Sequence, residues 1–265
     1  MIDRLRREWQ TLRDALTGLS PAQKQAAVVL VAATLLVLLQ LQIGGRRFYE
    51  VTLGNPLGFE DPRLGSWAWW FGMQGVTGFV IPVLILLVGF RLRPREAGLG
   101  LGDWKLASGI AALYIPLVIV GTWVLSDGAE FQRQYPHYLG AQTDWGVFFL
   151  YEALFLFYWL GWEYLWRGFA LFGTARAFGA PLAIVVQTVP FAILHADKPV
   201  AEAYLSVLGG LALGALVWRC RSFWIAVPIH AAQMMALDFF CALRARTGAS
   251  GIGLEALAEA LGGMA

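Results

Sequence analysis

The sequence predicts an all-α fold: a polytopic membrane helical bundle of about seven transmembrane helices with an N-terminal interfacial amphipathic helix. Of the 265 residues, 58% are hydrophobic and only 14% are charged, whereas a typical globular domain carries about 25% charged residues. The mean hydropathy is +0.60. Charged residues gather in a few stretches and leave long apolar runs between them, which is typical of a chain that crosses a bilayer repeatedly.

The first 25 residues predict a helix that lies along the membrane surface. Apolar residues recur there at spacings of three and four, which places them on one helix face with the arginines opposite. These apolar positions are Ile2, Leu5, Trp9, Leu12, Leu16 and Leu19. A frayed, solvated tail is the alternative, because short isolated helices are only marginally stable in water.

Seven apolar stretches follow, each near the roughly 20 residues that a membrane-spanning helix needs. They are expected at Ala26 to Ile43, Ser66 to Phe90, Ala107 to Leu125, Val147 to Phe172, Pro181 to His195, Ala201 to Trp218 and Phe223 to Leu243. Four of the stretches contain a proline, which predicts helix kinks packed against other helices rather than against lipid. These prolines are Pro82, Pro116, Pro190 and Pro228.

This pattern divides the chain into four parts without a separate soluble domain. They are the interfacial helix (1–25), the first membrane helices (26–145), a core of later membrane helices (146–243) and a C-terminal tail (244–265) to which the sequence assigns no role. More Lys and Arg residues fall on the side of the N-terminus than on the other side, which predicts a cytoplasmic N-terminus.

The net charge and the cysteine spacing give no support to several classes of function. A net charge of +2 is too small to indicate electrostatic binding of nucleic acid. Cys220 and Cys241 form no metal-binding or redox spacing and are interpreted as packing residues. In the sixth stretch Gly210 and Gly214 form a GxxxG pair, which predicts close helix contact either within the bundle or between two copies of the chain.

Ionisable residues inside the predicted spans are the candidates for function, because a lone charge in hydrocarbon is costly. Glu163 and Arg167 are four residues apart and share a helix face. They can form a structural ion pair that does no chemistry. They can equally belong to a reactive site.

His195 and His230 lie in two further spans and are expected to converge on Glu163. Glu202 and Asp238 each follow one of these histidines by about two helical turns and could orient it. Alternatively, Glu202 lies in the membrane interface and Asp238 caps a helix or pairs with Arg244.

Such a set suits glutamate-activated hydrolysis. A glutamate among apolar side chains favours its protonated form and can serve as a general base, here Glu163, while His195 holds the attacking water. His230 would then stabilise the oxyanion that forms at a peptide carbonyl. No cofactor is expected: zinc bound by Glu163, His195, His230 and Asp238 is a less favoured alternative, because the sequence has no HExxH motif.

The second half of the chain, roughly Val147 to Phe240, resembles the CPBP family of intramembrane endopeptidases, which includes the CAAX prenyl proteases and bacteriocin-processing and immunity proteins. Members carry EExxxR, FxxxH and HxxxN motifs on three membrane helices, and this chain reads WEYLWR, FAILH and HAAQM. The resemblance implies catalytic roles for Glu163, His195 and His230, with Arg167 and Phe191 in support. It also implies a bacterial cell membrane as the location and a membrane-associated protein or peptide as the substrate.

Two motif positions depart from the family pattern. The first Glu, the family's base, is Trp162, and the Asn that assists the oxyanion is Met234. Three hypotheses follow: Glu163 serves as the base, Glu202 or Asp238 replaces it, or the protein is a catalytically silent scaffold or immunity factor. A transporter is a further alternative, but no related halves are evident in the sequence.

Overall fold

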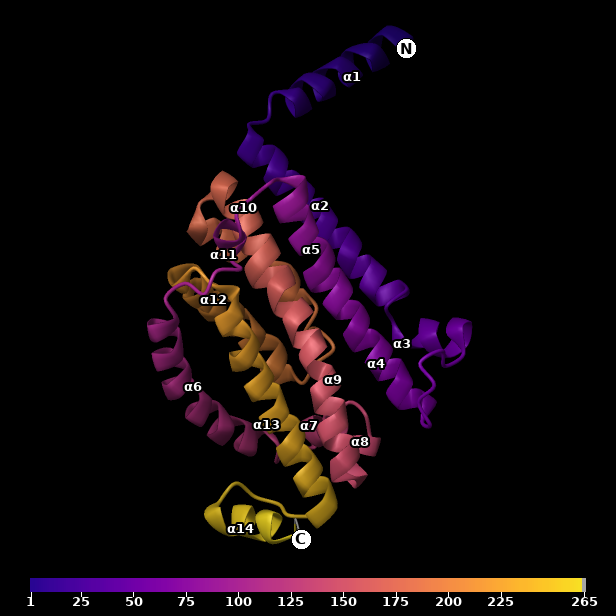
Figure 1. Cartoon of the computed structure of the whole chain (residues 1–265), viewed down its shortest axis with the longest axis vertical. Coiled ribbons are helices and arrows are strands. Elements are labelled where there is room, and N and C mark those ends of the chain that lie inside the picture. Colours follow the sequence, from indigo (N-terminus) through magenta and orange to yellow (C-terminus); the bar gives the residue numbers. More distant parts are fainter. Residues whose placement is uncertain (264–265) are drawn as a thin grey trace.

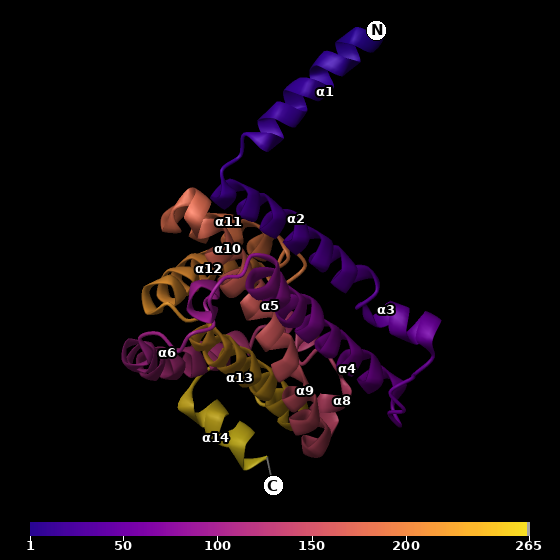
Figure 2. The same ribbon diagram turned by 45° about the horizontal axis from the view of Figure 1, so that its top comes forward.

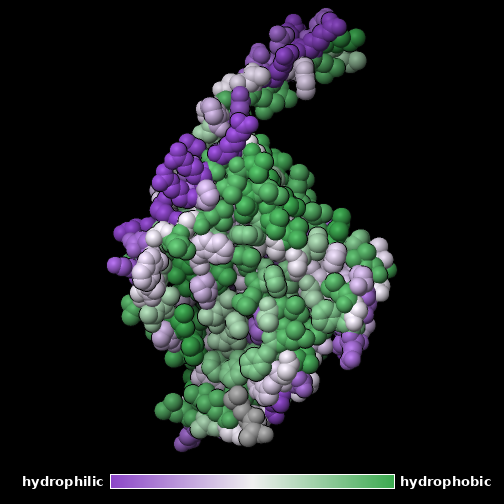
Figure 3. All heavy atoms as spheres, in the orientation of Figure 1, coloured by the Kyte–Doolittle hydropathy of each residue, from purple (hydrophilic) through white to green (hydrophobic). Residues whose placement is uncertain are grey.

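A computed structural model describes residues 1–263, and within that range the chain is helical with no strand (Figure 1). Six helices in this part of the chain are long and apolar enough to cross a membrane. The prediction of an all-α membrane bundle is therefore confirmed. The apolar side chains that cover the middle of the molecule in Figure 3 agree with lipid contact there.

The helix bounds follow the predicted stretches closely. Three of the six long helices are α2 (Pro21–Gln42), α6 (Trp104–Leu125) and α12 (Val200–Cys220). The other three are continuous segments at Pro62–Gly89, Trp145–Phe178 and Phe223–Thr247. They contain α4 (Pro62–Gly75) and α5 (Ile81–Leu84), α9 (Trp145–Glu163) and α10 (Leu171–Phe178), and α13 (Ala226–Thr247), respectively. Shorter elements are α3 (Arg46–Phe48), α7 (Ala129–Gln134), α8 (Gly140–Thr143) and α14 (Leu254–Gly262).

The fifth predicted span is the exception. Helix α11 (Ala180–Ile193) has only 14 residues and ends before His195. Pro190 lies inside it and cannot donate a backbone hydrogen bond. The chain then turns through 194–198, so this helix is shorter than a full membrane crossing requires.

The N-terminal helix α1 (Ile2–Thr17) forms as predicted and projects away from the bundle in Figures 1 and 2. Its apolar face is exposed, including Leu5 and Trp9. Ser20 then begins α2 with a capping box, in which its hydroxyl accepts from the Gln23 backbone and the Gln23 side chain accepts from the Ser20 backbone. The membrane-surface position of α1 stays a prediction.

Helix α9 (Trp145–Glu163) packs closely along the α4 to α5 segment because glycines stand at the crossing. A Cβ atom on Gly161 would lie 1.9 Å from the backbone oxygen of Gln74, and one on Gly78 would lie 2.3 Å from the oxygen of Gly161. Only glycine permits this approach of the two backbones.

The Gly210 and Gly214 pair is an internal packing seam. A Cβ on Gly210 would meet Thr188 at 2.8 Å, and one on Gly214 would meet the Gln187 amide nitrogen at 2.7 Å. That amide donates to the Gly210 carbonyl at 2.9 Å. The pair therefore joins α12 to α11, which decides between the two readings of the GxxxG pattern.

The C-terminal tail is fastened to the bundle by Arg244, near the end of α13. Its guanidinium pairs with Asp127 at 3.0 Å and donates to the carbonyls of Ala249 and Gly251. The tail then forms α14, whose small residues pack near Trp123. The sequence assigned no role to this tail, but the structure shows that it packs against the bundle.

We expect Gly161→Ala to destabilise the bundle, because the new methyl group would overlap the α4 backbone. Overpacking of this kind costs about 1 to 3 kcal/mol. The melting temperature in detergent, followed by size-exclusion chromatography, measures the effect. Gly109→Ala on α6 is the matched control, since nothing lies within 4 Å of its added Cβ. Equal stability of the two variants would contradict the close crossing.

Candidate active site

Glu163 and Arg167 form a fully buried ion pair where α9 passes into a wide π-type segment (Tyr164–Ala170). Glu163 Oε1 lies 3.2 Å from Arg167 Nη1. The guanidinium also stacks over the Phe191 ring of α11 at 3.9 Å, which favours Arg over Lys at this position. The ion pair that the four-residue spacing allows is therefore present.

His230 reaches the same carboxylate from α13 (Ala226–Thr247). Its Nδ1 lies 2.6 Å from Glu163 Oε1, and its ring packs on Trp159 with centroids 4.5 Å apart. Glu163 therefore accepts hydrogen bonds from two helices, its own and α13. This shared contact brings the first and third motifs together.

His195 occupies the turn after α11 rather than the helix itself. Its Nδ1 lies 2.7 Å from the Phe191 carbonyl oxygen, so the ring donates from Nδ1. The ring packs against Phe191, with centroids 4.5 Å apart, and lies 6.0 Å from the Trp162 ring. The second motif therefore joins the other two through Phe191, which also touches Arg167.

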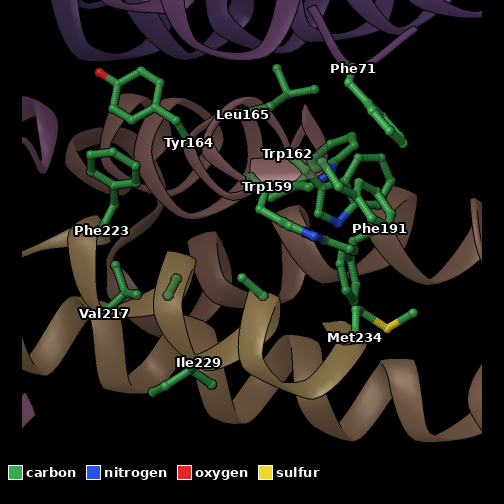
Figure 4. Close-up of a cluster of buried hydrophobic side chains, with 14 of the residues drawn as sticks. Phe71, Trp159, Trp162, Tyr164, Leu165, Phe191, Val217, Phe223, Ile229 and Met234 are labelled. Carbon is green, nitrogen blue, oxygen red and sulfur yellow. The ribbon is translucent and has the colours of Figure 1, made fainter. Parts of the chain in front are cut away.

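A cavity of about 530 Å³ lies beside these residues. Its wall includes both motif histidines and the two departed motif positions. Among its lining residues are Trp159, Trp162, His195, Glu202, His230 and Met234. Figure 4 shows Trp159, Trp162 and Phe191 gathered together, with Met234 below them.

Glu163 and Arg167 do not line this cavity; both side chains are buried behind its wall. Trp162, the neighbouring residue on α9, faces the cavity instead. The rim of the cavity includes Leu41 and Ile193, whose side chains are exposed on the outer surface. The cavity is thus bordered by apolar groups on the face that lipid would cover.

The remaining predicted residues separate into two environments. Glu202 lines the cavity, and both of its carboxylate oxygens accept from the Tyr135 hydroxyl, at 2.7 and 2.6 Å. Asp238 is fully buried and faces Glu152. Asp238 does not pair with Arg244, whose ion-pair partner is Asp127.

A loop that the sequence reasoning missed supplies further polar groups. His137 lies between α7 and α8, lines the cavity and accepts from the Lys198 ammonium at 2.8 Å. Burial and then the Lys198 charge lower the pKa of His137 from 6.5 to about 3. The sequence signal for this loop is the group of three ring side chains at Tyr135, His137 and Tyr138.

The donor set for a metal ion is incomplete in this arrangement. Glu163 and His230 are in contact. Within residues 1–263, however, no three His, Cys, Asp or Glu side chains lie close enough to hold a metal ion.

Comparison with known families agrees with the motif geometry. Residues 143–235 match the family model described as Type II CAAX prenyl endopeptidase Rce1-like. This segment is similar to the Rce1-like family. The resemblance inferred from the three motifs is confirmed, and the match spans the helices from α9 to the first half of α13. No curated protein and no solved structure matches the chain.

Loss of the buried guanidinium should destabilise the Rce1-like segment. Arg167→Ala leaves Glu163 without one of its two partners, and breaking a buried ion pair in this way costs about 3 to 5 kcal/mol. Thermal unfolding in detergent measures the change. Arg63→Ala is the control, because that side chain is 73% exposed. A melting temperature for Arg167→Ala equal to that of the control would contradict the pairing.

The lowered pKa of His137 predicts an acid-dependent loss of stability. Below about pH 6.5 the unfolded chain takes up a proton at this residue, whereas the folded chain does so only near pH 3. Stability is therefore lost as the pH falls through this window. His137→Gln should flatten the dependence of melting temperature on pH between 6.5 and 4. An unchanged pH dependence in the variant would show that His137 does not cause it.

Proposed function

We propose that this chain is an intramembrane endopeptidase that hydrolyses a peptide bond in a membrane-associated protein or peptide. The observation that carries the proposal is that both motif histidines line one cavity and lie within the Rce1-like segment. The family supports protease activity, and the enclosing apolar helices support a substrate that is itself held in the membrane. A prenylated chain end is one such substrate.

Each histidine uses Nδ1 in a hydrogen bond, which leaves its Nε2 nitrogen available to a substrate or a water molecule. The Phe191 carbonyl is an acceptor only, so His195 carries its proton on Nδ1 and, in the neutral ring, presents a lone pair on Nε2. That nitrogen can accept a hydrogen bond from water. His195 therefore suits the role of holding the attacking water.

His230 has a carboxylate partner instead. The Glu163 carboxylate accepts from Nδ1, and when the ring also carries a proton on Nε2, that N–H is a free donor. A donor at the cavity wall can stabilise the oxyanion of the tetrahedral intermediate. In this proposal Glu163 is a positioning residue that acts through His230, because its carboxylate is buried behind the wall.

The proposal is tested by comparing membrane and secreted proteomes of host cells that express the native chain or His195→Gln at equal levels. We expect peptide termini that depend on the native chain to disappear in the variant. Asp144→Asn is the control, since Asp144 caps α9 away from the cavity wall and should leave the termini unchanged.

The outcomes separate the candidate functions. Termini that are the same with and without the native chain would overturn the peptidase proposal, and a phenotype on deletion would then favour the silent scaffold. The proposal uses no metal ion, so cleavage by the purified protein in lipid discs should persist with a zinc chelator. Loss of cleavage that zinc restores would favour the metal alternative.

A further inference from the structure

The proposed hydrolysis needs a general base, and no carboxylate of α9 lines the cavity. Where the family pattern has its first Glu, this chain places the indole of Trp162 in the cavity wall. The adjacent Glu163 has no exposed surface and already accepts from Arg167 and His230. A base must come within hydrogen-bond reach of the water that it deprotonates.

Among residues 1–263, two carboxylates line the cavity, Asp197 and Glu202. Asp197 is exposed in the turn after α11. Glu202 is partly buried in the first turn of α12, and it lies within electrostatic range of His230 and Lys198. Of the two, Glu202 is therefore the carboxylate that lines the cavity from inside the bundle, near His230.

The Tyr135 hydroxyl fixes the Glu202 carboxylate. The hydroxyl has one proton, which is shared between the two carboxylate oxygens at 2.7 and 2.6 Å. Each oxygen therefore keeps lone pairs for another donor. Tyr135 is fully buried, so it holds the carboxylate in a fixed position. A carboxylate that is fixed by one partner and still able to accept is what a general base requires.

We infer that Glu202 is the general base of this site, which places the base on α12 instead of α9. This inference rests on the proposed peptidase function. Water held by His195 attacks the carbonyl carbon of the substrate, and its proton passes to Glu202 as the new C–O bond forms. The carbonyl electron pair moves to the oxygen, where the His230 Nε2–H stabilises it.

Collapse of the tetrahedral intermediate completes the reaction. The carbonyl re-forms, the C–N bond breaks, and the proton on Glu202 passes to the departing nitrogen. The products are a carboxylic acid and an amine, and Glu202 returns to its ionised form. No oxidant, reductant or further co-reactant enters the balance.

Glu202→Gln tests the inference, because the amide keeps an oxygen that accepts from Tyr135 but cannot take up a proton at neutral pH. Cleavage of the native-dependent precursors is measured with the full chain in lipid discs, using the membrane fraction of a deletion strain as the substrate source. General base catalysis contributes about 100- to 10,000-fold, so we expect a rate loss in that range. Asp144→Asn, the control outside the cavity wall, should keep the native rate.

A second experiment separates a base from a merely structural carboxylate. Glu202→Ala removes the carboxylate, and added formate should restore part of the cleavage rate, because formate can occupy the vacated space and accept the proton. No restoration, with the melting temperature of the variant unchanged, would overturn the inference. If Glu202→Gln and Glu202→Ala do not fold, Glu202→Asp, which withdraws the carboxylate by one methylene, replaces them. A native rate in Glu202→Asp would also overturn it.

These outcomes are distinguishable from failure of the proposed function. If the native chain cleaves nothing, the peptidase proposal fails and the inference with it. If the native chain and Glu202→Gln cleave at the same rate while His195→Gln does not, the peptidase proposal stands and Glu202 is not the base.

Discussion

Burial of charge inside an apolar bundle is the constraint on which this structure depends. Glu163, Arg167 and His230 lie where an isolated charge would be costly, and each is stabilised by another member of the set. Their contacts determine where α13 lies against α9 and where α11 contributes Phe191. The cavity wall is built on this buried set, so the site and the packing of the core share the same interactions.

The sequence predicted most of the fold because lipid imposes a simple rule. A membrane helix needs about 20 apolar residues, and hydropathy locates such stretches to within a few residues. Hydropathy did not locate a full span at α11, because this helix ends at Ile193 after only 14 residues. Hydropathy also did not indicate α14, because its small residues give little signal. The position of this helix depends instead on hydrogen bonds from Arg244 to the segment before it.

The site was predictable only in part, for a geometric reason. Spacing along one helix placed Glu163 and Arg167 on a common face. It did not show which helix face lines the cavity. Neighbouring residues on a helix differ in direction by about 100°, so Trp162 lines the cavity whereas Glu163 points into the packed interior. The contacts that Tyr135 and His137 make with Glu202 and Lys198 join segments more than 60 residues apart. No local pattern reports such contacts.

The apolar rim at Leu41 and Ile193 determines how a ligand would find the cavity. A molecule dissolved in the bilayer searches in two dimensions, and its mole fraction among the lipids sets the rate of encounter. Dilution with extra lipid would then slow the encounter, whereas dilution with buffer would leave it almost unchanged. For such a ligand, the size of the membrane that surrounds the protein acts as the reaction volume.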